Sequence, residues 1–583
     1  MLATIAGIFI SCILFILVLI GIIAAVAAGS GGKEVTVKKN SVLELKLNYM
    51  IPERTSANPF SNFDFASFEG NKNAGLNDIL KCIRSASKDE NIKGIYLNVS
   101  VSPNNYGTLE EIRDALIEFK KSKKFIIAYG EVMEEHSYYL ASVADKIYLN
   151  PAGELLLNGF NYQEPYLKNM FDKIGVEPEL IRHGKYKAAG EPLIADKMSD
   201  ENRKQIETYV GGMYKHFIAK IAESRKKSYD EVFNIANKLL IQCPDDAKKL
   251  GMIDSVCYED NVTDELKRLL SIKESEKINF IGCSTYSHNA KDNSTLTSKN
   301  KIAVIYIEGD IVSGDGEDDK SAGSKKIAES ISKCRKDSTV KAIVLRINSP
   351  GGSALASDVM WREIELAKKS KPVIASFGAV AASGGYYVGA PANVIVAEPN
   401  TITGSIGVFG LLINAQKLLN DKLGINFQTV KFGEYSDLGT LDRPMTVAEK
   451  EIVQRAIDKV YNDFVSKVAD GRKLKKEFVD SIAQGRVWTG EDGMKIGLVD
   501  SIGGLDKAIA IAVQRAKLKD YRISNYPEPK EFFENILKTL TDDVSLYFTK
   551  KQLGEDFKYY EQLRKATQMK GIQARMLWDA EIK

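Results

Sequence analysis

The stretch "PVIASFGAVAASGGYYVGAPANVIVAEPNTITGSIGVF" (372–409) decides the fold, because the chain contains it a second time in altered form. It has the pattern of a β-branched strand, a loop of small residues, a helix that starts at two tyrosines, a second strand and a turn at a proline. The same order recurs in "FIIAYGEVMEEHSYYLASVADKIYLNPAGELLLNGF" (125–160). Tyr138 and Tyr386 are 248 residues apart, and so are Pro151 and Pro399. The stretch therefore predicts an internal repeat.

The same spacing continues on both sides of this stretch. "KGIYLNV" (93–99) and "KAIVLRI" (341–347) are also 248 residues apart, and "GMID" (251–254) precedes "GLVD" (497–500) by 246. Spacing this steady indicates a tandem duplication. In each copy, β-branched runs alternate with helical patterns, so we expect a layered α/β fold built from repeated β-β-α units.

Five segments follow from these patterns. They are an N-terminal anchor (1–30), a first copy (31–283), a polar linker (284–300), a second copy (301–520) and a C-terminal extension with helical spacing (521–583). The extension matches neither copy, and we expect packing helices or an oligomer arm there.

The anchor rests on 27 residues without a charge, from Leu2 to Ala28. About 20 apolar residues suffice to span a bilayer, so we predict one transmembrane helix. A cleaved signal peptide is the alternative, favoured by the small residues of "AVAAG" but disfavoured by the length of the run and the absence of basic residues before it. The first lysines follow the span, and the positive-inside rule alone would place them in the cytoplasm.

Composition argues against several kinds of site. The chain has 80 Lys and Arg residues against 77 Asp and Glu residues, a balance that does not point to a nucleic-acid partner. Its six cysteines include no C-x-x-C pair and its four histidines no H-x-x-x-H pair, so we predict no metal site and no disulfide framework. There is no P-loop and no convincing dinucleotide fingerprint. We therefore predict that the chain uses no cofactor.

The two copies differ at one serine. Ser383 of the second copy corresponds to Glu135 of the first, and the two glycines after Ser383 correspond to His136 and Ser137. Small residues beside a serine let a substrate backbone approach it. This difference makes Ser383 a candidate nucleophile, which needs a neighbouring base to remove its proton.

A second difference lies in the loop after the 341–347 strand. Here the second copy has "NSPGGSALASDV" (348–359), whereas the first has "SVSPNNYGTLEE" (100–111). A glycine pair between a strand and a helix can aim backbone N–H groups into a cleft, as an oxyanion hole requires. Pro103 has no N–H to offer. Gly351 and Gly352 are therefore candidate oxyanion residues, the alternative being that they serve only a turn.

The third difference runs the other way. When "HGKYK" (183–187) is aligned with "FGEYS" (432–436), Lys187 of the first copy falls opposite Ser436. A lysine amine held neutral by burial can act as the base for a serine. The pattern favours Lys187 in this role. His183 and His136 are rival candidates for the base, each paired with Ser383 across the two copies. The other alternative is that Lys187 is an ordinary surface lysine with no role in catalysis.

Five motifs carry a resemblance to a known family. They are "AASGGYYVGAPAN", "LRINSPGGS", "TITGSIGVFG", "KYKAAGEPLIADKMSDENR" and "GRVWTGEDGMKIGLVDSIGG". In this order they resemble the long, tandem-domain form of the signal peptide peptidase A family, also called protease IV, in peptidase family S49. The resemblance extends from the anchor to about residue 520.

The resemblance implies a membrane-anchored serine protease in which each copy has a Clp/crotonase-like fold. It implies a homotetramer on the outer, periplasmic face of the cytoplasmic membrane, with the lipid bilayer as a partner. The implied substrates are remnant signal peptides and other hydrophobic peptides.

The resemblance also assigns roles to individual residues. Ser383 would be the nucleophile, Lys187 the general base, and Ser405 the hydroxyl that orients the lysine. Leu157 stands opposite Ser405 in the first copy, which is consistent with a single site. Gly351, Gly352 and Gly384 would shape the oxyanion hole.

Two other functions remain open at this stage. A crotonase-type acyl-CoA hydratase or isomerase also holds an oxyanion with backbone N–H groups, but it needs no membrane anchor and usually an acidic residue in the active copy. A membrane scaffold with an inactive site is the second, and the intact Ser383 and Lys187 argue against it.

Overall fold

The computed structural model describes most of the chain between residues 36 and 528. The described ranges are 36–56, 73–290, 297–317, 321–528 and 571–576, with Gly7, Thr295, Gln552 and the pairs 63–64 and 69–70. No helix in this part of the chain is long and apolar enough to cross a bilayer. The anchor predicted between Leu2 and Ala28 lies outside the described residues, apart from Gly7.

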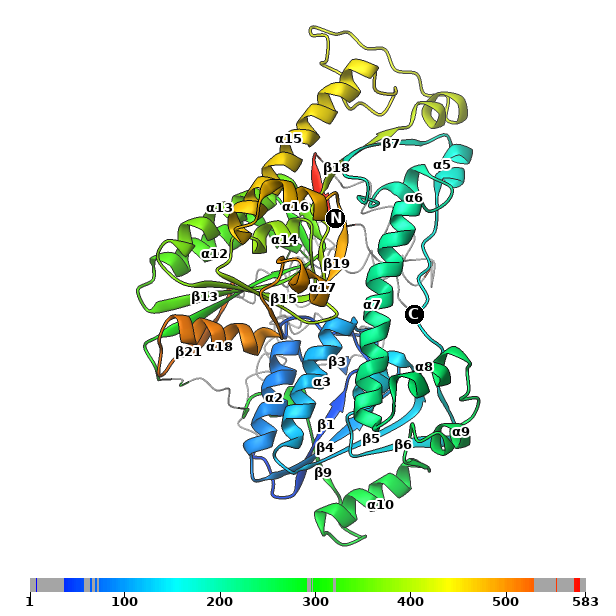
Figure 1. Ribbon diagram of the computed structural model, residues 1–583, viewed down its shortest axis with the longest axis vertical. Coiled ribbons are helices and arrows are strands. Elements are labelled where there is room, and N and C mark those ends of the chain that lie inside the picture. The colour runs from blue at the N-terminus through cyan, green and yellow to red at the C-terminus, as the bar shows by residue number, and fades with distance from the viewer. Residues whose placement is uncertain are drawn as a thin grey trace.

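The first copy builds a parallel sheet in the strand order β8-β6-β5-β4-β1-β9 (Figure 1). The strands are β1 (Ser41–Lys46), β4 (Ile92–Asn98), β5 (Phe125–Met133), β6 (Lys146–Leu155), β8 (Ser255–Val256) and β9 (Asn279–Gly282). A further pair, β2 (Phe63–Asp64) and β3 (Glu69–Gly70), lies apart from this sheet.

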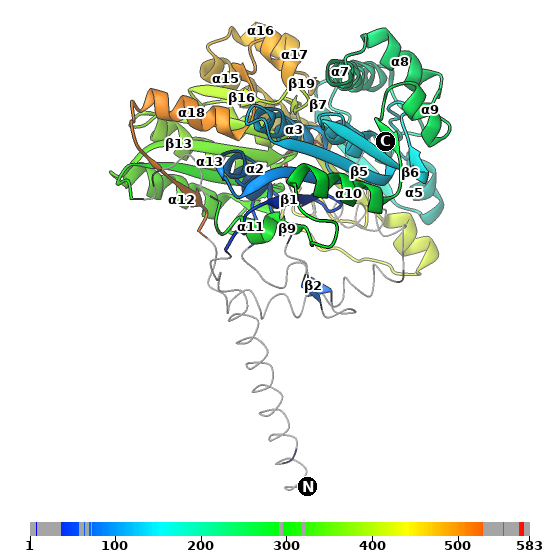
Figure 2. The same ribbon diagram turned by 90° about the horizontal axis from the view of Figure 1, so that it is seen from below.

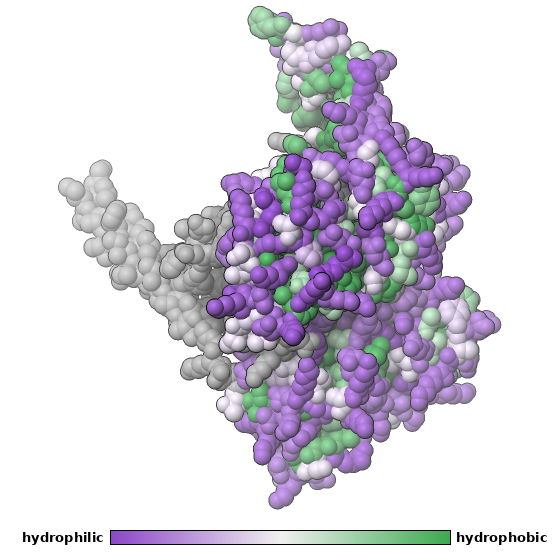
Figure 3. All heavy atoms as spheres, turned by 60° about the vertical axis from the view of Figure 1, so that its left-hand side comes forward, coloured by the Kyte–Doolittle hydropathy of each residue, from purple (hydrophilic) through white to green (hydrophobic). Residues whose placement is uncertain are grey.

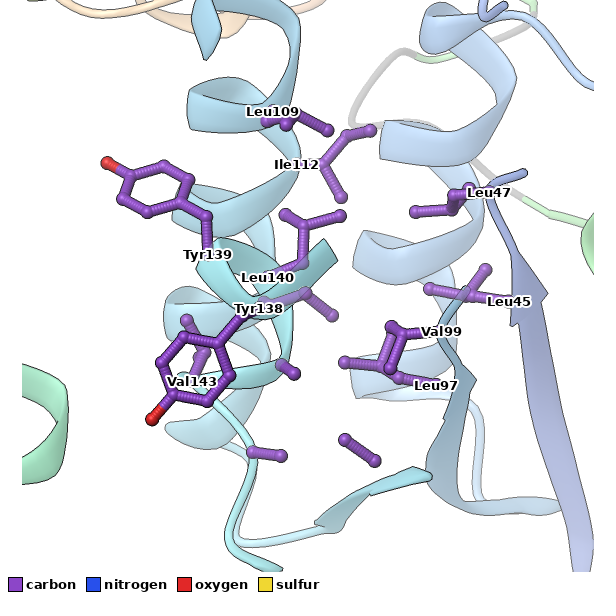
Figure 4. Close-up of a cluster of buried hydrophobic side chains, with 14 of the residues drawn as sticks. Leu45, Leu47, Leu97, Val99, Leu109, Ile112, Tyr138, Tyr139, Leu140 and Val143 are labelled. Carbon is purple, nitrogen blue, oxygen red and sulfur yellow. The ribbon is translucent and has the colours of Figure 1, made fainter. Parts of the chain in front are cut away.

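Both faces of this sheet are covered by helices, because successive side chains of a strand point to opposite faces. Leu43 and Leu45 join the core beneath α2 (Leu76–Lys88) and α3 (Tyr106–Lys120), whereas Val42 packs with α10 (Glu259–Leu270) on the other side. Figure 4 shows the first of these cores, where leucines of β1 and β4 lie across from α3 and Leu140 of α4 (Glu135–Ala141), while Tyr138 and Tyr139 point away from them. Strands buried on both faces account for the continuous apolar runs in the sequence.

The second copy repeats this arrangement. Its sheet contains the order β21-β10-β13-β15-β16-β20, the counterpart of β9-β1-β4-β5-β6-β8, and adds β17 and β19 beside β15. The strands are β10 (Lys301–Glu308), β13 (Val340–Ser349), β15 (Val373–Ala382), β16 (Val394–Ala397), β17 (Ile402–Gly404), β19 (Val487–Thr489), β20 (Ser501–Ile502) and β21 (Arg522–Tyr526). The repeated strand order confirms the tandem duplication and the α/β class.

Helices cover both faces of the second sheet as well. In Figure 2, α18 (Leu505–Arg515) lies on one face, and α12 (Ser324–Lys336) and α13 (Ala354–Lys368) lie on the other. Each copy also contains one long helix of 26 residues, α7 (Asp200–Arg225) in the first and α15 (Val447–Arg472) in the second. Both begin after a hydroxyl side chain, Ser199 or Thr446, that accepts a hydrogen bond from the backbone N–H three residues later.

A third sheet joins the two copies, in the order β12-β11-β14-β22-β18-β7. Its strands are β7 (Glu177–His183), β11 (Asp310–Val312), β12 (Ser321–Gly323), β14 (Gly351–Ser353), β18 (Val408–Asn414) and β22 (Gln573–Arg575). Strand β7 of the first copy pairs antiparallel with β18 of the second, from His183 opposite Val408 to Glu177 opposite Asn414. The residues that follow β7 are thereby held against the second copy.

The C-terminal extension differs from the sequence-based prediction. We expected packing helices or an oligomer arm from residue 521 onward, and most of this extension lies outside the described residues, but its described part includes two strands, β21 and β22. Strand β21 pairs with β10 as β9 pairs with β1, so the second copy continues past the boundary expected at residue 520. The helical spacing of the surrounding sequence does not predict these two strands, because each is extended through pairing with neighbouring strands: β21 with β10, and β22 with β14 and β18. The linker also differs slightly, since α11 (Cys283–Tyr286) begins before it and ends within it.

A buried ion pair network fastens the two copies together. Arg346 on β13 is fully buried, and its Nε lies 2.7 Å from Glu53 Oε2. Its Nη2 contacts Glu111 of α3, and its Nη1 donates to Ser376 Oγ at 3.0 Å. Burial acts to lower the pKa of the guanidinium, but the carboxylates of Glu111 and Glu53 outweigh it and raise that pKa. Both carboxylates come from the first copy, so the arginine stays charged at the interface.

Replacing Arg346 with alanine should destabilise the protein strongly, because Glu53 and Glu111 would stay buried without a counter-charge. We expect a loss of about 3–5 kcal/mol in the free energy of unfolding. Thermal unfolding followed by circular dichroism measures it. Arg268→Ala is the matched control, since Arg268 forms an exposed pair with Glu265 that is worth about 0–1 kcal/mol. Equal shifts of the melting temperature in both variants would contradict the expectation.

Candidate active site

Ser383 lies at a sharp turn between β15 and the short helix α14 (Gly384–Gly389). Its backbone has φ of 54° and ψ of −113°, a conformation that residues with a side chain rarely adopt. The Ser383 N–H donates to the carbonyl of Gly404 at 2.8 Å, which holds the turn in place. Such a turn presents the hydroxyl at the end of the strand. The serine itself is fully buried in this structure.

The two glycines after Ser383 allow the close packing of this turn. A Cβ at Gly385 would lie 2.6 Å from the Ser349 carbonyl oxygen, and one at Gly384 would lie 2.6 Å from Ser357 Oγ. Both distances are shorter than side chains tolerate. The first copy replaces these glycines with His136 and Ser137 and has no such turn at this point.

Lys187 reaches Ser383 from the first copy. Its Nζ lies 2.8 Å from Ser383 Oγ, 3.1 Å from Ser405 Oγ and 3.3 Å from the Ser405 carbonyl oxygen. The side chain is 1% exposed. Burial lowers the pKa of the Lys187 amine well below its ordinary value. A neutral amine at this distance can accept the proton of the serine hydroxyl.

The loop that carries Lys187 is held by contacts with both copies. Arg182 Nη1 donates to the Lys187 carbonyl oxygen at 2.8 Å, and the Tyr186 N–H donates to the Gln484 carbonyl oxygen at 2.9 Å. Gly485 has φ of 79°, and a Cβ there would lie 2.6 Å from Lys187 Cα. The second copy thus presses its backbone against the lysine and keeps water from it.

Ser405 also lies within hydrogen-bond distance of the Lys187 amine. It is buried, has φ of 48°, and its N–H donates to the Arg486 carbonyl oxygen at 2.7 Å. Its hydroxyl and its carbonyl oxygen both lie within reach of Lys187 Nζ and can fix the direction of the amine. Leu157, opposite it in the first copy, is buried in an apolar core.

The three glycines proposed for an oxyanion hole occupy different positions. Gly384 begins α14, so its N–H has no partner within the helix. Gly351 has φ of 97°, and its N–H donates to Ser349 Oγ at 3.1 Å. Gly352 packs against β11, where a Cβ would lie 2.0 Å from the Ile311 carbonyl oxygen. Gly384 therefore offers the clearest donor, and Gly351 and Gly352 allow the backbone to come close.

The corresponding site of the first copy is filled by side chains. Glu135 Oε1 accepts hydrogen bonds from the N–H groups of Asn158 and Gly159, at 2.9 and 3.1 Å, and burial raises the pKa of this carboxyl. His136 stacks on Tyr106 with ring centroids 4.4 Å apart, and burial lowers the pKa of the imidazole to about 4. The backbone N–H groups of Asn158 and Gly159 are therefore already hydrogen-bonded to a side chain of the protein.

One cavity of about 1090 Å³ is lined by residues of both copies, and Ser383 is not among them. Glu135, His136 and Pro103 line it from the first copy, and Ser405 and Asn348 line it from the second. Lys187 also lines it. A ligand in this cavity would contact the lysine from a position between the copies.

The rival base His183 is engaged elsewhere. Its Nδ1 lies 2.7 Å from Asp458 Oδ1, and its ring stacks on Tyr461 with centroids 3.8 Å apart. Among the described residues, Lys187 is the side-chain base within hydrogen-bond reach of Ser383 Oγ. The Ser383 hydroxyl also donates a hydrogen bond to the Gly407 carbonyl oxygen at 3.3 Å. No group of three or more His, Cys, Asp or Glu side chains in the described ranges could hold a metal ion.

Sequence reasoning missed the second-copy glycines that enclose Lys187. A Cβ at Gly407 would lie 3.2 Å from Lys187 Cδ, and Gly485 approaches the lysine backbone. Both glycines belong to motifs quoted above, "TITGSIGVFG" and "GRVWTGEDGMKIGLVDSIGG". Both glycines lie in motifs of the copy that contains Ser383, and this is the feature of the sequence that could have identified them.

Comparison with known proteins agrees with the duplication. The family model described as peptidase family S49 matches residues 118–273 and again residues 365–519. Among solved structures, a mutant of ClpP1 from Listeria monocytogenes matches with a TM-score of 0.24 and 14% identity, covering 35% of this chain and 94% of that chain. That score is too low to bear on the fold.

Several curated proteins match over most of their length. The chloroplastic serine protease SPPA of Arabidopsis thaliana is 34% identical over 548 residues, which covers 93% of this chain and 78% of the relative. Protease 4 of Salmonella typhi is 33% identical over 542 residues, covering 91% and 87%, and Protease 4 of Haemophilus influenzae is 35% identical over 447 residues, covering 75% and 72%. This chain therefore belongs to peptidase family S49 and is a serine-type peptidase with a tandem repeat.

Proposed function

We propose that the protein is a membrane-bound endopeptidase that uses a Ser383–Lys187 dyad to degrade remnant signal peptides and other hydrophobic peptides. The observation that carries the proposal is the 2.8 Å distance between Lys187 Nζ and Ser383 Oγ, in a site where the amine is buried. Membership in a peptidase family makes a crotonase-type hydratase untenable. The remaining alternative is a membrane scaffold with an inactive site, which would show no turnover and no labelling of Ser383 by a fluorophosphonate.

The proposed reaction passes through an acyl-enzyme. Ser383 Oγ attacks the peptide carbonyl carbon while Lys187 takes the hydroxyl proton. The N–H of Gly384, beside the loop of Gly351 and Gly352, stabilises the negative charge on the carbonyl oxygen. Lys187 then gives its proton to the departing amine. Water, deprotonated by the same lysine, hydrolyses the ester and restores the serine.

Ser405 acts as a positioning residue in this scheme. Its hydroxyl and carbonyl oxygens, 3.1 and 3.3 Å from the amine, keep the nitrogen lone pair directed at Ser383. No cofactor is needed, because each proton taken from one group returns to another.

Membrane attachment through residues 1–30 would place the enzyme at the cytoplasmic membrane, with its two copies on the outer face. Signal peptides left in the bilayer are apolar, and small residues around Ser383 leave room for small or apolar side chains. The names Serine protease SPPA and Protease 4 among the relatives support proteolysis as the activity.

A homotetramer is part of the same proposal. The segment between β18 and α15 projects from the body of the molecule (Figure 1), and apolar surface shows at its tip (Figure 3). Val430 and Phe432 in this segment are 81% and 99% exposed. Apolar side chains so exposed favour contact with another copy. Native mass spectrometry of the detergent-solubilised chain measures the number of copies.

Substitution of either member of the dyad should abolish turnover. We expect Ser383→Ala and Lys187→Ala to lower kcat/KM for a fluorogenic peptide by about a thousandfold or more, because each removes a group that the proton transfer needs. His183→Ala should keep its activity within about tenfold of the unaltered protein, as expected of a group outside the proton transfer. A fluorophosphonate should label the folded protein at Ser383. Loss of activity in the histidine variant alone, or a folded protein that resists the label, would contradict the dyad.

Replacing Lys187 with methionine should stabilise the protein at neutral pH. The unfolded lysine has a pKa of about 10.4, and each unit by which folding lowers it costs about 1.4 kcal/mol at a pH below both values. The unfolded chain therefore binds more protons than the folded one at neutral pH, and the stability of the unaltered protein rises with pH. The melting temperature of Lys187→Met should exceed that of the unaltered protein at pH 7, and the gap should narrow toward pH 10. Exposed Lys185→Met is the control, and a gap that widens with pH would refute the buried neutral amine.

The enzyme should prefer apolar peptides. We expect kcat/KM for a peptide with the apolar core of a signal peptide to exceed, by about tenfold or more, that for a peptide of equal length with lysines beside the cut bond. Buried charges carry a desolvation cost that apolar side chains lack. Liquid chromatography with mass spectrometry compares the two rates and locates the cut. Equal rates would argue against hydrophobic peptides as the substrate class.

A further inference from the structure

The cavity between the two copies has carboxyl groups in its wall without matching positive charges. Glu134, Glu135 and Glu164 of the first copy line it. Among the described residues, Lys187 is the one lysine or arginine that also does so, and burial lowers the pKa of its amine well below the ordinary value. A cleft lined by charges of one sign attracts ligands of the opposite sign.

Glu164 lacks a basic partner in the described part of the chain. Its Oε2 accepts a hydrogen bond from the Tyr166 hydroxyl at 3.4 Å, and no ion pair with a described residue includes it. Burial, together with the nearby Glu191 carboxylate, raises the pKa of the Glu164 carboxyl to about 7. A positive group beside this carboxyl would favour its charged form and would be bound by it. Glu134, half-buried in the same wall, likewise forms no ion pair within the described ranges.

Two buried polar atoms of the same wall also lack partners. Among the described residues, the Tyr106 hydroxyl and Asn400 Oδ1 form no hydrogen bond, although these residues are only 2% and 1% exposed. Both residues line the cavity. Burial raises the pKa of the Tyr106 hydroxyl well above its ordinary value, and the carboxylates of Glu135 and Glu134 add to this effect, so the hydroxyl lies near them. Buried polar groups are normally hydrogen-bonded, and these two are available to a ligand in the cavity.

Tyrosine rings form another part of the wall. Tyr106, Tyr162 and Tyr209 all line the cavity. The face of an aromatic ring attracts a cation. Carboxylates, an amide oxygen and aromatic faces together suit an ammonium or guanidinium group.

The cavity lies next to the proposed dyad. Lys187, Ser405 and Gly485 form part of its wall, and Lys187 Nζ lies 2.8 Å from Ser383 Oγ. Pockets for small molecules have volumes of about 300–1,000 Å³. At about 1090 Å³, this cavity has room for more than a single side chain. A peptide whose cut bond lies at Ser383 can therefore extend a neighbouring segment into it.

We propose that this cavity binds a lysine or arginine side chain of the peptide substrate, with Glu164 and Glu134 as its charge partners, an inference that rests on the proposed peptidase function. Signal peptides carry basic residues before their apolar core. The apolar core would lie at Ser383 and the basic segment in the cavity. A charge beside the cut bond loses its hydration without compensation, whereas a charge in the cavity meets carboxyl groups. The first copy thus binds the substrate at the place where it lacks the serine.

Peptide binding to the full-length Ser383→Ala protein tests the inference without turnover. The probes are two labelled, N-acetylated peptides with the same apolar core, which differ by one lysine or glutamine outside that core. Fluorescence anisotropy should give a dissociation constant about tenfold or more lower for the lysine peptide, because a hydrogen bond to a charged group contributes about that factor. Adding Glu164→Gln should reduce this ratio to about threefold or less, and adding Glu164→Lys should favour a peptide with glutamate at the varied position.

Glu131→Gln is the matched control. Glu131 is an exposed residue of β5 that does not line the cavity, so the same loss of charge there should leave the ratio as it was. Equal dissociation constants for the lysine and glutamine peptides would overturn the inference. So would a ratio that survives the combined Glu134→Gln and Glu164→Gln changes. Tight binding only of peptides with a free N-terminus would assign the cavity to an α-ammonium group and overturn side-chain recognition.

Turnover of the same peptides by the unaltered protein separates this inference from the proposed function. Cleavage of both peptides, with equal binding of the two, would overturn the cavity's role and leave the peptidase function standing. A preference for the lysine peptide in binding, with cleavage of neither, would contradict the peptidase function alone. Faster cleavage of the lysine peptide at low concentration, lost in Glu164→Gln, supports both.

Discussion

The burial of the Lys187 amine is the constraint on which the rest of the structure depends. In the proposed dyad the Lys187 amine acts as a base only in its neutral form, and burial favours that form because it removes the water that hydrates the charged amine. Strand β7 pairs with β18 of the other copy, and this pairing delivers the lysine to Ser383. The glycines of the second copy then close over its side chain. Residues of both copies enclose the amine, and the buried charges of Arg346, Glu53 and Glu111 hold the two copies together.

The two copies differ at the positions that form the candidate site. In the first copy, Glu135 occupies the place of Ser383, and its carboxylate accepts from the backbone N–H groups of Asn158 and Gly159. A buried carboxylate that is hydrogen-bonded in this way fastens a loop instead of reacting with a peptide. In the second copy, the residue opposite Lys187 lies on an exposed loop that projects from the body. The two differences are complementary: the lysine comes from the first copy and the serine from the second.

The repeat made much of the fold predictable. The repeat predicts that the two copies share one strand order, although it does not say which order, and Ser383 and Lys187 stand out because each lacks a counterpart. Ser405 could be assigned only through the family resemblance, since Leu157 opposite it looks like any core residue. Strand β22 escaped prediction for a physical reason: three residues have no periodicity, and their extended conformation comes from β14 and β18. The pairing of β7 with the other copy is equally a matter of tertiary contact.

Strand β22 completes the third sheet with the protein's own chain. Two unpaired strand edges beside a reactive serine would invite other chains to pair with them. A built-in strand satisfies those backbone groups, and it buries Ala574 among the side chains of the second copy. Its short length limits the number of hydrogen bonds, and its pairing with β18 involves one residue pair, Gln573 with Phe409.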